Sequence, residues 1–487
     1  MSDYVIHGFE PKRVFEYFEQ ISAIPRGSGN EQGIADHLSC FARKRGLDYV
    51  RDASNNLLIK KPATPGREGE APLLFQGHTD MVCEKNSNVV HDFEHDSIRL
   101  IQNGNELTAD GTTLGADNGI AVAMMMALLD GALESHPAIE CLFTTEEETG
   151  MGGAIAFDYS LLSARHMVNL DSEEERVVTV GCAGGIRSDL SIPVSYGAIG
   201  TRELCRVSLT GLGGGHSGAD IHTGRANANL LLGRLLASLE DVRLVCIEGG
   251  SKDNAITREA TAIVAVPSVA ASSMKLLALG DEIAGELVEA DENCAIRCER
   301  LTEQETLELP QVMDETTTAR VLGLLCNAPC GVLAMSADVE GLVEYSRNLG
   351  ILRTTDGTVR MTFTSRASRE SRLDGTVTAL DALAAALGAT VQHHSRYPGW
   401  EYAPVSPLRE AYRVAYRAVC GKDMTVVAIH AGLECGYIKR QIPDMDIISI
   451  GPDMKAIHSP DETLYLDSVE RVWTALTRLI ADWHVNQ

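Results

Sequence analysis

Cysteine is sparse in this sequence, which has 12 cysteines among 487 residues and no C-x-x-C pair. That density is too low for the disulfide framework of a small secreted domain. Most of the cysteines lie in apolar stretches such as residues 140–143, a pattern typical of buried, reduced thiols. The sequence therefore argues against a disulfide scaffold or a zinc knuckle and predicts a cytoplasmic protein.

Long hydrophobic runs are also missing. The longest run, residues 120–129, has ten residues, whereas a transmembrane helix needs about 20. The start of the chain has no basic segment followed by an apolar one, so we expect no export signal. Neither a membrane-spanning segment nor a membrane partner is expected.

Basic residues are outnumbered by acidic ones, 42 Lys and Arg against 68 Asp and Glu, which gives a net charge of −26. Such a chain repels the phosphates of nucleic acids, so no nucleic-acid partner is expected. The acidic excess is compatible with carboxylates around a cation, although a solvated acidic surface is its commoner cause. The apolar fraction of 44% is sufficient for sizeable cores, and the length is typical of about two to four domains.

Short apolar runs alternate with helical stretches in the first third of the chain, which is typical of an α/β domain with a mainly parallel sheet. The runs lie at 71–76, 139–144, 166–170 and 177–180. The pattern returns near the end of the chain, with strands predicted at 424–429 and 447–450 and helices at 408–419 and 466–483. Both ends of the chain are therefore predicted to form one α/β domain.

The middle of the chain has a different pattern, typical of an α+β domain. Strands predicted at 204–209 and 359–363 lie next to helices predicted at 225–239 and 376–387. We therefore predict an α/β domain made of residues 1–185 plus 399–487, with an inserted α+β domain of residues 186–398.

Five segments, most of them at predicted strand ends, carry residues that commonly bind metal ions. These residues are His78 and Asp80, Asp117, the glutamates at 146–148, Asp171, and His458. Each has an ordinary explanation when taken alone, such as a helix N-cap, a solvated acidic run or a turn. In an open α/β sheet, however, ligands bind at the carboxyl ends of the strands, so we expect these residues to meet there.

Two imidazoles and several carboxylates, with no thiolate, suit zinc or a similar divalent ion, with manganese or cobalt as alternatives. An odd number of carboxylates allows one of them to bridge two cations. Each cation is then left with an imidazole and one further carboxylate. The sequence has no convincing Ser-His-Asp or Cys-His arrangement, and its Gly-rich segment 213–215 lacks the G-K-[ST] of a phosphate loop. These residues predict a two-metal hydrolase.

The sequence resembles the aminoacyl-histidine dipeptidases, also called cytosol non-specific dipeptidase or peptidase D, within the carnosinase and aminoacylase superfamily of zinc peptidases. The matching motifs are GHTDMV at 77–82, GADNG at 115–119, TTEEETGMGG at 144–153, NLDSEE at 169–174, GGGHSG at 213–218, HAGLECG at 430–436 and IGPDMKAIHSPDE at 450–462. They cover essentially the whole chain in the same order. The resemblance implies a catalytic domain of the zinc-dependent exopeptidase type and an inserted lid or dimerisation domain.

The resemblance also implies a metal centre with two Zn²⁺ ions per subunit, for which Co²⁺ or Mn²⁺ can substitute. The implied ligands are His78, Asp117 and Asp171 for one zinc and Asp117, Glu147 and His458 for the other. Asp80 is expected to hold the ring of His78 in one tautomer, as metal-bound imidazoles generally require. Glu146, beside a ligand but not one itself, is the predicted general base.

Substrate-binding residues are implied in the inserted domain and near the end of the chain. They are His216, Asn254, Arg366 and Gly432. His216 is expected to stabilise the tetrahedral oxyanion, and the Arg366 fork suits a terminal carboxylate. Many relatives have Asp two positions before this arginine, where this chain has Thr364. The insertion is also longer than the dimerisation domain of many superfamily members, and an enlarged lid can either form a dimer or substitute for one. Of these two arrangements, a homodimer through this domain is expected.

The function predicted from the resemblance is metal-dependent hydrolysis of dipeptides with broad specificity, including Xaa-His dipeptides, by an activated water with a glutamate as base. A deacylase of N-acyl amino acids or a carboxypeptidase could have the same metal site. A metal-dependent binding protein without activity is a third interpretation. The presence of both Glu146 and Glu147 argues against the third, since loss of the base is the simplest route to an inactive relative.

Overall fold

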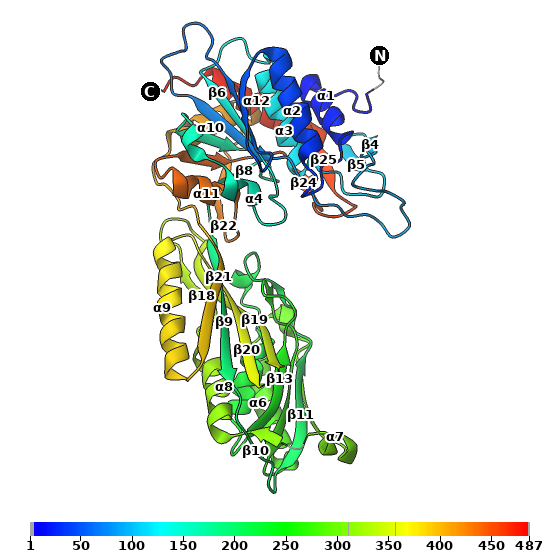
Figure 1. Cartoon of the computed structure of the whole chain (residues 1–487), viewed down its shortest axis with the longest axis vertical. Coiled ribbons are helices and arrows are strands. Elements are labelled where there is room, and N and C mark those ends of the chain that lie inside the picture. The colour runs from blue at the N-terminus through cyan, green and yellow to red at the C-terminus, as the bar shows by residue number, and fades with distance from the viewer. Residues whose placement is uncertain (1–3, 310, 356, 486–487) are drawn as a thin grey trace. The chain divides into compact units, whose positions relative to one another are not determined.

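The computed structural model describes residues 4–309, 311–355 and 357–485. The chain forms two compact units, the first reaching to Gly181 and including 402–428 and 433–487, the second made of 182–401 and 429–432. In Figure 1 the first unit contains both the blue start and the orange to red end of the chain. The boundaries lie a few residues from the predicted ones. The prediction differs for 429–432, which joins the second unit because the N–H of Ala183 donates to the carbonyls of Ile429 and Ala431.

The first unit is built on an eight-stranded sheet whose order is β1-β2-β6-β3-β7-β23-β8-β22. Its strands are β1 Asp48–Arg51, β2 Leu57–Lys61, β3 Leu73–His78, β6 Ile139–Thr144, β7 His166–Asn169, β8 Val177–Cys182, β22 Thr425–Ile429 and β23 Asp446–Ser449. The neighbours β6, β3, β7 and β23 are parallel, whereas β1, β2 and β8 pair in the antiparallel sense. The prediction of an α/β fold with a mainly parallel sheet is confirmed. The central strands are buried on both faces, which explains their continuous apolar runs.

Helices flank this sheet, and a small second sheet has the order β24-β25-β5-β4. The elements are α1 Lys12–Ser22, α2 Gln32–Arg45, α3 Ala116–Leu129, α4 Gly152–Ala156, α10 Pro407–Cys420, α11 Glu434–Gln441, α12 Leu466–Ala481, β4 Leu100–Asn103, β5 Glu106–Ala109, β24 Met454–Lys455 and β25 Thr463–Tyr465. Local signals set the ends of several helices. Gly46 ends α2 in the left-handed conformation, and the side chain of Ser406 caps α10 ahead of Pro407.

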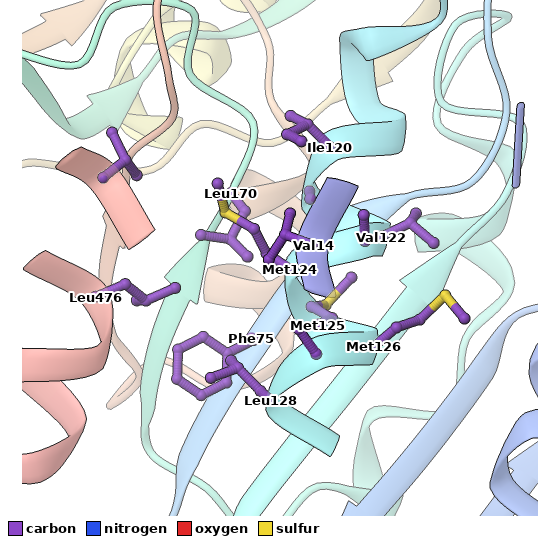
Figure 2. Packing of buried hydrophobic residues seen from close by; sticks show 14 of the residues in the cluster. Val14, Phe75, Ile120, Val122, Met124, Met125, Met126, Leu128, Leu170 and Leu476 are labelled. Carbon is purple, nitrogen blue, oxygen red and sulfur yellow. The ribbon is translucent and has the colours of Figure 1, made fainter. Parts of the chain in front are cut away.

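Helix α3 is buried on nearly every side, as expected of a helix that is apolar all round. Figure 2 shows Met124, Met125 and Met126 of α3 in the same core as Phe75 of β3 and Leu476 of α12. Flexible methionine side chains can fill the irregular space between such elements. This packing holds α3 in place, and its first turn carries one of the predicted metal ligands.

The second unit has a nine-stranded antiparallel sheet with the order β16-β11-β15-β13-β19-β20-β9-β21, in which β18 also pairs with β19. Its strands are β9 Gly184–Pro193, β11 Glu203–Thr210, β13 Arg243–Gly249, β15 Ala260–Val266, β16 Ala295–Arg300, β18 Gly331–Met335, β19 Val343–Thr355, β20 Thr358–Ala367 and β21 Thr390–Tyr397. The two short pairs are β10 Tyr196–Ala198 with β17 Gln311–Met313, and β12 Gly215–His216 with β14 Ala255–Ile256. The helices are α5 Ala228–Ala237, α6 Val269–Ala284, α7 Glu303–Leu307, α8 Glu315–Asn327 and α9 Glu370–Ala386.

Among residues 4–309, 311–355 and 357–485, no helix has the length and apolar character needed to cross a membrane.

Candidate metal centre

The predicted metal ligands come together in the first unit. His78 is the last residue of β3, the glutamates follow β6, and Asp171 lies just beyond the end of β7. Because these three strands are parallel and adjacent, their carboxyl ends meet at one edge of the sheet. Asp117 reaches this edge from the start of α3, and His458 from the turn between β24 and β25.

Asp117 lies between the two histidines. Its Oδ1 is 3.1 Å from Nε2 of His78, and its Oδ2 is 3.2 Å from Nε2 of His458. Nε2 of His78 is also 3.4 Å from Oδ1 of Asp171, while Nε2 of His458 is 3.0 Å from Oε2 of Glu148. Two groups of three donor atoms therefore share one carboxylate, which has the form of a bridged two-cation site.

The donor atoms fit divalent cations. Tetrahedral bonds of about 2.0–2.2 Å place the ligands of zinc about 3.3–3.5 Å apart, close to the 3.0–3.4 Å measured here. One imidazole N–H cannot point directly at two carboxylates, yet each Nε2 faces two of them. The buried Oε1 of Glu148 also has no hydrogen-bond partner among the described residues. Imidazole and carboxylate donors suit zinc, cobalt and manganese.

The contacts of the three glutamates after β6 are shifted by one residue from the contacts predicted for them. Glu148, not Glu147, lies against His458 and Asp117. Glu147 belongs, together with Glu148, to a third group that contains His78. Glu146, the predicted general base, is exposed, adopts a φ of 52° and belongs to none of the metal-type groups formed by the described residues.

Hydrogen bonds to Asp80 explain why Glu147 and Glu148 turn toward the other predicted ligands. Oδ1 and Oδ2 of Asp80 accept the backbone N–H groups of Glu147 and Glu148 at 3.1 and 3.2 Å, and Oδ2 accepts the hydroxyl of Ser28 at 2.7 Å. Oδ1 also lies 3.3 Å from Nδ1 of His78, as predicted for a residue that orients a metal-binding ring. The sequence did not indicate the two backbone contacts, which turn the second and third glutamates inward.

Two neighbouring carboxyl groups, those of Glu147 and Asp80, have pKa values shifted in opposite directions. Burial, with the negative charge of Asp171, raises the pKa of Glu147 to about 9. Although burial opposes it, interaction with the His78 ring and Ser28 lowers the pKa of Asp80 to about 2. Positive charge favours the ionised form, so cations in this centre would lower the pKa of Glu147 and make it available as a proton acceptor.

The four predicted substrate-binding residues all lie in the second unit. His216 of β12 pairs in register with Ala255 of β14, which follows Asn254 directly. Nδ1 of His216 accepts the N–H of Ala219 at 3.0 Å, and burial lowers the pKa of the ring. The neutral ring therefore carries its proton on Nε2, where it can be donated. Gly432 lies in the segment that joins this unit just before α11.

Arg366 of β20 donates one hydrogen bond to a neighbouring side chain and has a further N–H group without a partner among the described residues. Its Nη1 donates to the hydroxyl of Tyr397 at 2.7 Å, whereas its buried Nε has no partner in the described parts of the chain. The next strand carries Ser346, in register with Arg366, and its hydroxyl lies 2.7 Å from Nε2 of the buried His430. Burial and the charge of Arg366 lower the pKa of His430 to about 3, so this second imidazole is neutral. Neither His430 nor Tyr397 was among the residues predicted from the sequence to bind substrate.

The model of peptidase family M20/M25/M40 matches residues 74–482 of this chain. The chain belongs to that family. It is 37% identical over 478 residues to the cytosol non-specific dipeptidase of Escherichia coli strain K12, covering 97% of this chain and 98% of the relative. Its structure matches the aminoacylhistidine dipeptidase of Vibrio alginolyticus with a TM-score of 0.94 and 36% identity over 100% of both chains. A Staphylococcus aureus tripeptidase, 14% identical with a TM-score of 0.55 and covering 97% of this chain and 98% of its own, shares the fold alone.

Three buried charged residues that were not predicted surround the metal centre of this M20/M25/M40 peptidase. They are Arg26, Glu434 and Glu462, each at most 2% exposed. Glu434 accepts the side-chain N–H of Gln76 at 2.6 Å and the hydroxyl of Thr144 at 2.8 Å, which supports the ends of β3 and β6. Both glutamates lie inside the family motifs at 430–436 and 450–462, so the sequence contained a signal for them. Arg26 lies in a glycine-rich turn without any such signal.

Proposed function

We propose that this chain is a metal-dependent dipeptidase of broad specificity that also cleaves Xaa-His dipeptides. The observation that carries the proposal is the pair of donor groups that share Asp117, each with one imidazole and one further carboxylate. The similarity to dipeptidases over nearly the whole chain supports the substrate class. We further propose a cytoplasmic location and a homodimer formed through the second unit as a lid domain.

The ligand assignment follows the measured contacts. His78, Asp117 and Asp171 would hold one Zn²⁺, and Asp117, Glu148 and His458 the other, with Co²⁺ or Mn²⁺ as substitutes. When bound, two such cations supply a Lewis acid for the peptide carbonyl and lower the pKa of a water molecule. Asp80 would orient the His78 ring through Nδ1, leaving Nε2 to hold a cation.

Glu147 is the proposed proton carrier. Its carboxylate would accept the proton of the attacking water and pass it to the nitrogen of the departing amine as the peptide C–N bond breaks. One proton is taken and one delivered, so the residue returns to its starting state and no covalent intermediate is required. Burial and the negative charge of Asp171 raise the pKa of this carboxyl group, and bound cations would lower it, so that the group could both accept and return a proton.

The residues of the second unit are proposed to bind the dipeptide. His216 would donate its Nε2 proton to the oxygen that becomes negative in the tetrahedral intermediate, since its Nδ1 already accepts two backbone N–H groups. Arg366, with an unpaired Nε, would bind the terminal carboxylate. Asn254 and the backbone of Gly432 are assigned to the peptide backbone of the substrate.

The direct test is hydrolysis of Ala-His, with N-acetyl-histidine and Ala-Ala-His alongside, by protein stripped with a chelator and then given Zn²⁺. We expect cleavage of the dipeptide alone, complete loss on stripping and recovery with zinc, measured as released histidine. Cleavage of N-acetyl-histidine instead would show a deacylase, and trimming of the tripeptide from its carboxyl end a carboxypeptidase. Cation binding without any hydrolysis would favour a binding protein.

The role of Arg366 predicts a change in KM. Arg366→Lys keeps the charge but loses the fork, and a charged hydrogen bond of about 1.5–3 kcal/mol corresponds to a rise in KM of about 10- to 100-fold. We expect kcat for Ala-His to change much less, because the carboxylate is bound equally before and during reaction. Arg360→Lys, an exposed arginine on the same strand, is the control and should leave KM unchanged. A drop in kcat at constant KM would contradict the assignment.

A further inference from the structure

Glu462 binds the loop that carries Asp117. Its Oε2 accepts the backbone N–H groups of Leu114 and Gly115 at 2.8 and 2.9 Å. Its Oε1 accepts those of Ala116 and Asp117 at 2.8 and 3.2 Å. One carboxylate thus satisfies four consecutive N–H groups at the start of α3, where a helix leaves such donors free and favours negative charge.

Glu462 also belongs to the loop of His458, which lies four positions before it in the chain. This loop folds on itself, because the hydroxyl of Ser459 donates to the carbonyl of Ala456 and the N–H of Glu462 donates to the carbonyl of Ser459. His458 itself has a φ of 61°, in the left-handed region that few residues other than glycine adopt. Glu462 therefore links two loops. One is its own loop, which carries the proposed ligand His458, and the other carries Asp117, the ligand proposed to bridge both cations.

Arg26 makes the complementary connection. Its Nη1 donates to the carbonyls of Thr79 and Asp80, at 2.9 and 3.1 Å, and its Nη2 donates to the carbonyl of Gly115. Thr79 directly follows His78. The guanidinium therefore connects the loop that follows His78 with the loop that carries Asp117. In the Asp117 loop, Arg26 binds a carbonyl group and Glu462 binds N–H groups.

The glycines of the GADNG motif are explained by this arrangement. Gly115 has a φ of 70°, and a Cβ there would come within 2.6 Å of Nη2 of Arg26. A Cβ at Gly119 would lie 2.5 Å from the same atom. Both positions must lack a side chain for the buried guanidinium to reach the loop.

We infer that Glu462 and Arg26 are positioning residues, which fix Asp117 between His78 and His458 by binding the backbones of the three ligand loops. The inference rests on the cation sites of the proposed function and not on its substrate. An ordinary helix cap satisfies one or two N–H groups from the adjacent residue. Here two fully buried, oppositely charged side chains, from distant parts of the chain, bind the loop of the shared ligand.

The test is a competition titration of cation-free, full-length protein with Zn²⁺ and a chromophoric chelator. Loss of a residue that orients metal ligands lowers affinity by about 10- to 100-fold, and we expect this for Glu462→Gln at both sites, because both use Asp117. Glu462→Asp keeps the charge but has a shorter reach, so an intermediate loss is expected. Arg26→Lys should also weaken binding, since one ammonium group cannot reach three carbonyls.

The matched control is Glu140→Gln. Glu140 is 2% exposed, accepts the N–H groups of Ser163 and Ala164, and lies near the other end of β6. This variant is expected to lower the melting temperature but to bind both cations as the wild type does. Wild-type affinity in Glu462→Gln and Arg26→Lys would overturn the inference. Failure of Glu462→Gln to fold, with normal binding by Glu462→Asp and Arg26→Lys, would reduce both residues to a purely structural role and overturn it as well.

The two levels of the proposal can fail separately. Wild-type protein that binds two cations but cleaves no dipeptide would contradict the proposed substrate class and leave the positioning of Asp117 open to the same titration. Wild-type protein that does not bind a second cation would overturn the two-cation centre and the inference with it.

Discussion

Replacing Glu147 with glutamine is expected to lower kcat for Ala-His by about 10²- to 10⁴-fold, the usual contribution of a general acid–base residue. The glutamine side chain has nearly the same shape but cannot accept and return a proton. Both cations should remain bound, because Glu147 is not among the proposed ligands. The measurement is initial-rate hydrolysis together with the metal content of the same sample.

Glu146→Gln is the matched control, one residue away and of identical chemistry. The side chain of Glu146 is exposed, so the kcat of the Glu146→Gln variant should stay within about twofold of wild type, as for most surface substitutions. The opposite ranking, with Glu146→Gln inactive and Glu147→Gln active, would identify Glu146 as the general base. This pair of variants therefore decides the register of the three glutamates.

Asp117→Asn is expected to remove both cations and nearly all activity. The two oxygens of Asp117 face two different imidazoles, and an amide offers a single, uncharged oxygen in their place. Loss of several kcal/mol of electrostatic stabilisation corresponds to a decrease in kcat/KM of about 10³-fold or more. Metal content after gel filtration, measured by plasma mass spectrometry, should fall well below two per chain.

Two further variants test whether the loss of both cations is specific to the carboxylate that faces both imidazoles. Asp171→Asn removes a ligand that faces His78 alone, so one cation should be retained. Asp110→Asn alters an exposed carboxylate, paired with Arg99 at 2.8 Å, in the same part of the sequence and should change neither quantity. Retention of two tightly bound cations by Asp117→Asn would show that this residue does not bridge them.

The sequence predicted the edge of the sheet at which the site lies, because parallel strands give their carboxyl ends to one place. His78, Asp117, Asp171 and His458 could be found in this way, since each follows an apolar run or precedes a helix. Spacing alone could not choose among three adjacent glutamates. Their orientation depends on two hydrogen bonds to Asp80, which lies in the loop after another strand, β3.

Long-range contacts also account for what the sequence did not reveal. Arg26 and Glu462 act on the backbone of a loop that is distant in the chain, and backbone partners leave no side-chain pattern to detect. Residues 429–432 were assigned to the first domain because they follow a predicted strand of it. Their hydrogen bonds with Ala183 place them in the second unit.

The parallel pairing of β7 with β23 has a consequence for how the protein is made. The ribosome releases His166–Asn169 long before Asp446–Ser449, and at about 5–20 residues per second the interval is on the order of 15 s to a minute. During this time the nascent first unit has an unpaired strand edge and lacks α12, which covers part of its core. The intervening second unit, whose sheet is encoded in the continuous stretch from β9 to β21, is free to fold first.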